Sequence, residues 1–293
     1  MLLIRSSWTA PTALAALLLL TPACGDSGTT ETPAPDQPAA PSAEEAPSPT
    51  ADAGTKIDFA AASSRGKTAM FVPAPSEFQI ALAASEVTTS LKDRLGEDGS
   101  LDGKSKPVMA LETGRRIANV LLASKDGTKE AVTARMKSAR AGLQALGAGD
   151  EVLSETDKLI ADYEAGTIGN TELPPAMDIL NQKIQKALAS GAGEEITTLV
   201  QAGGWVQGVH LLSSVLAEGG GSKEAPALVH QPTVLAHFTE FIKQSSAAKA
   251  GDEDVVVVIT ELDAMSEIAK KDTLGPEDLK AVATHTGNII ARF

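Results

Sequence analysis

The stretch that most constrains the fold runs from Glu195 to Glu218 and is apolar over most of its length. Its apolar residues cover too wide an arc for a single helical stripe, which indicates a helix that neighbours cover on most sides. Gln201, Gln207 and His210 interrupt the run, so it is too polar to span a bilayer. We therefore expect a buried central helix. Its apolar positions are Ile196, Leu199, Val200, Trp205, Val206, Val209, Leu211, Leu212, Val215 and Leu216.

Three glycines, Gly203, Gly204 and Gly208, lie inside this expected helix. Because glycine costs a helix interior about 1 kcal/mol relative to alanine, their presence favours close approach by the backbone of a neighbouring helix. The alternative is a helix that breaks at Gly203–Gly204, with Trp205 starting a second segment. Trp205 either fills the core, as most tryptophans do, or forms the floor of a cleft for a sugar or peptide.

The run AGGWVQG at Ala202–Gly208 is similar to a segment of a family of uncharacterised secreted bacterial lipoproteins. The similarity extends to FVPAPSEF at Phe71–Phe78 and to LGPEDLKAVATHTGNII at Leu274–Ile290. This resemblance implies a helical fold without an assigned activity, and it supplies no catalytic residue.

The start of the chain is typical of a secretory signal, which we assign to residues 1–23. Arg5 supplies a positive charge, and the apolar run Ala13–Leu20 is too short to span a bilayer. Thr21–Cys24 resembles a bacterial lipobox, although Thr21 stands where leucine is usual. Since Cys24 is the only cysteine of the chain, we expect it to be acylated and to become the new N-terminus. The alternative is an ordinary signal peptide that leaves a free thiol.

Residues 24–56 form an expected disordered tether, because they hold almost nothing that could be buried. Six of the 32 residues in Gly25–Lys56 are proline. Such a segment spans about 30 Å as a flexible coil and ~100 Å as extended polyproline. Two or three acyl chains on Cys24 would anchor it to a membrane, where one chain is marginal. Gly25 after the cysteine favours the outer membrane, with the domain facing the periplasm.

Residues 57–293 are expected to form an all-α domain of about nine helices around the central one. The aromatic content is 3% and alanine is abundant, which favours thin helix contacts over a β-sandwich. Ser76 and Gln79 fit a capping box before the first helix. Val255–Ile259 is β-branched, but its helical apolar spacing continues to Ile268 and predicts a helix. The other expected helices are Glu77–Arg94, Val108–Ser124, Lys129–Leu146, Glu151–Ala165, Pro174–Ser190, Thr233–Gln244 and one from Pro276 to Ile290.

Residues that could carry chemistry are few and do not form a known pattern. The four histidines, of which His237 is followed by Glu240, lack the paired spacing of a metal site. Arg115 and Arg116 could anchor an anionic ligand, but pairing with acids of this region is the expected role. No catalytic motif or phosphate-cradling loop occurs, so we expect no enzyme activity, no metal and no cofactor.

The net charge of −13 excludes nucleic acid as an expected partner. The sequence therefore favours an exported lipoprotein of the bacterial cell envelope, bound to the membrane through Cys24. A non-catalytic structural or interaction module with an envelope protein as partner is the leading hypothesis. The alternative is a binding protein for a sugar, lipid or peptide, with a pocket near Trp205 that involves Gly203, Gly204 and Gly208.

Overall fold

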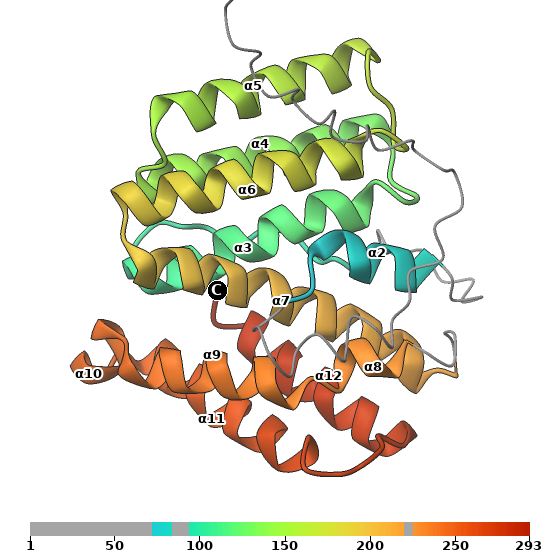
Figure 1. Ribbon diagram of the computed structural model, residues 1–293, viewed down its shortest axis with the longest axis vertical. Helices are drawn as coiled ribbons and strands as arrows, with labels where there is room; N and C mark the ends of the chain where they lie inside the picture. Colours follow the sequence, from blue (N-terminus) through green and yellow to red (C-terminus); the bar gives the residue numbers. More distant parts are fainter. Residues whose placement is uncertain (1–71, 84–93, 220–224) are drawn as a thin grey trace, which may run out of the picture. The chain divides into compact units, whose positions relative to one another are not determined.

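The computed structural model describes residues 72–83, 94–219 and 225–293, which all belong to one contact unit. These residues form helices and turns and contain no strand (Figure 1). The predicted all-α class is therefore confirmed. The signal sequence, Cys24 and the tether lie outside the described residues. The helices are α2 (Pro75–Ala83), α3 (Lys106–Ala123), α4 (Lys129–Leu146), α5 (Asp150–Ala165), α6 (Leu173–Gly191), α7 (Glu194–Ala217), α8 (Pro226–Val229), α9 (Pro232–Gln244), α10 (Ser246–Ala250), α11 (Glu253–Ile268) and α12 (Pro276–Ile290).

Helix α7 is the predicted central helix, and it runs through Gly203–Gly204 without interruption. The alternative of a break at these glycines is therefore wrong. Buried residues occur on all sides of α7 from Ile196 to Leu216. The helix packs most extensively against α3 and α12, and it also touches α2, α6 and α8. This arrangement explains why its apolar residues follow no single stripe, because each side of the helix faces a neighbour.

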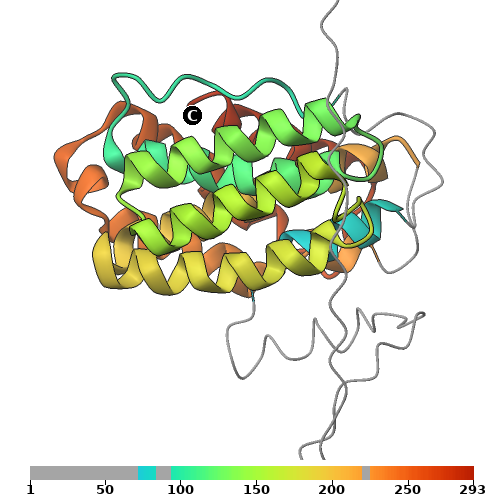
Figure 2. The ribbon, with the colours of Figure 1, turned by 90° about the horizontal axis from the view of Figure 1, so that it is seen from above.

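Helix α3 lies between α7 and α4, and every residue from Ala110 to Ala123 is buried. From α3, the chain continues through α4, α5 and α6, each packed on the one before, and α6 returns to α7 (Figure 2). Gly147 and Gly166 end α4 and α5 with φ of +83° and +75°, a left-handed conformation that glycine adopts without steric cost. Beyond α7, helix α11 packs against both α9 and α12.

Two local predictions need correction. The first helix begins at Pro75 rather than after Ser76, because proline has the φ of a first helical turn and needs no hydrogen bond there. Glu77, not Gln79, closes the cap, since its Oε2 accepts from the amide of Ala74 at 2.9 Å. The short helix α10 was missed, because its sequence SAAKA shows no apolar period. Of the expected helix Glu77–Arg94, residues 84–93 lie outside the described part.

Candidate functional site

The glycines of α7 lie where neighbouring elements come closest to it. A Cβ added to Gly203 would be closer than 3.0 Å to the carbonyl oxygen of Leu111 in α3, which real Cβ atoms essentially never are. Likewise, a Cβ added to Gly114 of α3 would be closer than 3.0 Å to the carbonyl oxygen of Val200 in α7. The backbones of α3 and α7 are therefore in direct contact, and any side chain at either position would separate them.

The other two glycines meet less rigid or more distant neighbours. A Cβ on Gly208 would overlap the aromatic ring of Phe78 in α2. A Cβ on Gly204 would lie 3.3 Å from the carbonyl oxygen of Gly114, which is tight but within the range of real contacts. Gly208 therefore makes room for a core aromatic side chain, whereas Gly204 faces the backbone of Gly114 across the helix crossing.

Trp205 belongs to the core by its burial. Its side chain is 2% exposed, and its ring centroid lies 5.6 Å from that of Phe238 in α9. The indole Nε1 is buried and has no hydrogen-bond partner among the described residues. An unpaired buried N–H costs free energy, so this donor is a feature that the helical packing alone does not explain.

A cavity of about 330 Å³ lies beside Trp205, at the low end of the range for small-molecule sites. Four parts of the chain surround it: residues 72–75 ahead of α2, and helices α3, α6 and α7. Gly114 and Gly204 at the helix crossing are among the residues that line it. The lining residues are Val72, Pro73, Ala74, Pro75, Gly114, Ile117, Asn181, Gln185, Val200, Gln201, Gly204 and Trp205.

The polar side chains that line this cavity are neutral amides. Asn181 and Gln185 are one turn apart on α6, and Gln201 is one turn before Trp205 on α7. All three are half-buried. Among the described residues that line the cavity, none carries a charge. The cavity therefore combines an apolar wall with groups that can both donate and accept hydrogen bonds.

Asp178 lies on α6 close to this cavity, one turn before Asn181. Burial raises the pKa of Asp178, and the hydroxyl of Ser76 in α2 offsets part of this effect. Oδ1 of Asp178 is buried and has no hydrogen-bond partner among the described residues.

A second cavity, of about 340 Å³, lies between the turn at residues 94–99 and the end of α12. Its lining includes Arg94, Arg115, Gln207 and His210. Arg94 is paired with Glu218, with 2.5 Å between its Nη2 and Oε2 of the glutamate. Burial lowers the pKa of His210, whose Nδ1 donates to the carbonyl oxygen of Ala283 at 3.0 Å. Both guanidinium groups that line this second cavity are therefore paired with carboxylates, Arg94 with Glu218 and Arg115 with Glu112.

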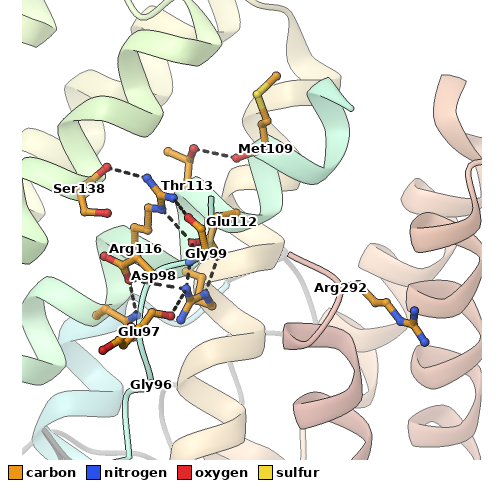
Figure 3. A network of polar contacts seen from close by, with 12 residues as sticks. Gly96, Glu97, Asp98, Gly99, Met109, Glu112, Thr113, Arg116, Ser138 and Arg292 are labelled. Carbon is orange, nitrogen blue, oxygen red and sulfur yellow. Dashed lines mark hydrogen bonds and ion pairs between the residues drawn. The ribbon is translucent and has the colours of Figure 1, made fainter. Parts of the chain in front are cut away.

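Arg115 and Arg116 belong to a buried ionic network around Glu112, which is completely buried (Figure 3). Oε2 of Glu112 accepts from Nε of Arg115 at 2.6 Å, and Oε1 accepts from Nε of Arg116 at 2.8 Å. Gly99 donates its amide to the same carboxylate at 3.2 Å, and Ser138 of α4 accepts from Arg116. The predicted pairing of the two arginines with acids is confirmed. The network attaches the connection before α3 to α3 and α4.

The histidines stay apart in the structure. His285 contacts Glu261 at 2.6 Å, and His230 contacts the carbonyl oxygen of Ala269 at 3.0 Å. His237 lies beside the rings of Phe238 and Phe241. In the part of the chain that the structure describes, no three His, Cys, Asp or Glu residues come together as metal ligands would. No helix in that part is both long and apolar enough to cross a membrane.

Sequence reasoning identified Trp205 and Gly204 but missed Asn181, Gln185 and Gln201. The helical period shows only that Asn181 and Gln185 border the apolar stripe of α6, a position that a solvated residue commonly takes. It could not have shown that α6 and α7 bring the three amides to one space. Comparisons with models of protein families, with curated proteins and with solved structures gave no match. The resemblance to secreted bacterial lipoproteins therefore stays a prediction.

Proposed function

We propose that this protein is an exported, lipid-anchored binding protein that holds a small molecule, without chemical turnover, in the cavity beside Trp205. The observation that carries the proposal is the cavity itself, which four separate parts of the chain line and which three half-buried amides and the unpaired indole Nε1 of Trp205 border. The anchor and tether would present the domain at the cell envelope.

A module that docks an envelope protein is supported less well. In the described residues, the exposed large apolar side chains are Ile80, Ile179 and Val256, which lie on three different helices. A stable protein interface needs about 800 Å² on each partner, with an apolar centre. Single exposed apolar residues are normal on a protein surface and mark no such site.

The intrinsic fluorescence of Trp205 tests the proposed function. Trp205 is the only tryptophan of the proposed mature protein, since the other one, Trp8, lies in the expected signal sequence. We expect saturable changes in emission when the full chain in detergent is titrated with small polar probes, namely glucose, N-acetylglucosamine, N-acetyl-alanine amide, glucuronate and glucosamine. The physical reason is that an occupant of the cavity changes the surroundings of the buried indole. Calorimetry with the same probes checks the stoichiometry.

Gln201→Phe is the matched blocking variant, because the larger ring fills the cavity from a half-buried position. It should abolish the saturable response. Gln182→Phe makes the same change at an exposed position of α6 that does not line the cavity, and it should leave binding unchanged. A flat response to all five probes, or an equal loss in both variants, would contradict the proposed function.

The anchor is tested by Cys24→Ser, which removes the sulfur that acyl transfer requires. We expect the unchanged chain to fractionate with membranes and to partition into detergent, whereas the variant should remain in the aqueous fraction. The physical reason is that the burial of acyl chains supplies membrane affinity, at about 0.8 kcal/mol per buried CH₂ group. Ser27→Ala is the neighbouring control. Retention of Cys24→Ser in the membrane fraction would refute acylation as the anchor.

A further inference from the structure

We infer that the cavity beside Trp205 selects an uncharged ligand whose groups both donate and accept hydrogen bonds, and that Asn181, Gln185 and Gln201 determine this specificity. The inference rests on the proposed function, because it names the class of ligand for the same cavity. It excludes anions, cations and purely apolar molecules such as acyl chains.

The first argument is that the three amides have unused hydrogen-bonding capacity. Among the described residues, the side chains of Asn181, Gln185 and Gln201 have no protein partner. Two amides elsewhere in the described part do have protein partners: Gln79 donates to Ser124 at 2.9 Å, and Asn288 donates to Glu261 at 3.1 Å. Three half-buried amides without protein partners, gathered around one space from two helices, offer donors and acceptors to a molecule in that space, and the buried indole Nε1 of Trp205 is a further unpaired donor beside it.

The second argument concerns charge. An ion held in this cavity would lose water without meeting an opposite charge, because no lining side chain is ionised. Asp178, one turn before Asn181 on α6, does not line the cavity, and burial raises its pKa, which favours its neutral form. The second cavity provides the contrast, since there guanidinium groups line the wall and carboxylates pair with them.

The third argument concerns the chemistry of amides. A side-chain amide offers two N–H donors and a carbonyl acceptor on the same plane, so it matches a hydroxyl or another amide. Ile117, Val200 and the proline-containing wall at residues 72–75 supply apolar contact for the remaining surface of the ligand. A sugar ring and a short peptide unit share these requirements. An acyl chain would leave all three amides unpaired and is disfavoured.

Titration with matched probes tests the inference. Glucose, glucuronate and glucosamine share one ring and differ in charge when the solution is slightly acidic. We expect glucose, N-acetylglucosamine or N-acetyl-alanine amide to bind at least about tenfold more tightly than glucuronate and glucosamine, because an unpaired buried charge is costly. Tighter binding of the sugars would identify hydroxyl groups as the recognised chemistry, and tighter binding of the blocked amino acid would identify the amide.

Gln185→Glu provides the specific variant, because it replaces an amide with a carboxylate of the same shape. We expect the affinity for the neutral probes to fall about tenfold and that for glucosamine to rise about tenfold, since the cation then meets an opposite charge. Gln182→Glu adds the same charge at an exposed position of α6 outside the cavity and should change neither affinity.

The outcomes separate the two proposals. Binding of glucuronate or glucosamine as tight as that of the neutral probes would overturn the selectivity and leave the binding function standing. The same holds if Gln185→Glu and Gln182→Glu shift the affinities equally, because long-range charge rather than contact would then account for the shift. Failure of every probe to bind would overturn the proposed function itself.

Discussion

Gly203→Ala should destabilise the domain by about 3 kcal/mol or more, although alanine normally stabilises a helix. The added Cβ would collide with the carbonyl oxygen of Leu111, which belongs to the rigid backbone of α3. Neither helix can give way alone, because α3 is buried along its length and α7 is covered on all sides. The helices must therefore separate, and the packing lost exceeds the gain of about 1 kcal/mol in helix propensity.

Gly204→Ala is the matched control, one residue further along the same helix. Its Cβ would lie 3.3 Å from the carbonyl oxygen of Gly114, a contact that a small shift can relieve. We expect a change in unfolding free energy within about 1 kcal/mol, since the propensity of alanine offsets the tight contact. Chemical denaturation followed by circular dichroism measures both variants. If Gly203→Ala is as stable as Gly204→Ala, the helix crossing is looser than the structure indicates.

The glycine pattern illustrates how far sequence reasoning reaches. Glycines inside an apolar helix predicted a close backbone neighbour, and Gly203 lies directly against α3. The sequence could not identify α3 as that neighbour, because its own glycine, Gly114, stands alone between charged and polar residues. Close approach depends on the surfaces of both helices, so the sequence of one helix does not identify the helix that it contacts.

The burial of α3 was harder to predict than that of α7. Glu112, Arg115 and Arg116 are charged residues inside the expected helix Val108–Ser124, and its sequence does not show whether they face solvent or the interior. The structure buries all three, because the connection around Gly99 covers them and supplies hydrogen-bond partners. Charged residues are mostly exposed in proteins, and only the tertiary structure shows which of them are buried in ion pairs.

The cavity was predicted only through Trp205. A tryptophan beside glycines suggested two alternatives, core or cleft, and the structure combines them: the indole is 2% exposed yet lines the cavity. The amides at Asn181, Gln185 and Gln201 gave no signal, because an amide on the edge of an apolar stripe is commonly a solvated residue. These three amides line one cavity only because of how α6 and α7 are placed relative to each other.

Glu112→Gln should lower the unfolding free energy by about 3–5 kcal/mol, the range for breaking a buried ion pair. Glu112 is fully buried and accepts hydrogen bonds from Arg115 and Arg116, which are 3% and 5% exposed. A glutamine of the same shape removes the charge while both guanidinium groups stay inside. Asp98, 3.6 Å from Arg115, compensates only part of the loss, because it is shared with Arg135. The uncompensated positive charge then favours unfolding.

The same variant should loosen the connection before α3, since Gly99 and Glu97 are attached to the network by hydrogen bonds. Hydrogen exchange of residues 96–105 should rise in Glu112→Gln more than exchange of α5, which has no contact with Glu112. Glu155→Gln is the matched control, because its partner Lys183 is exposed and such a surface pair contributes less than about 1 kcal/mol. Equal stability of the two variants would mean that Arg115 and Arg116 reach water when Glu112 is neutral, and that the network does not hold this connection in position.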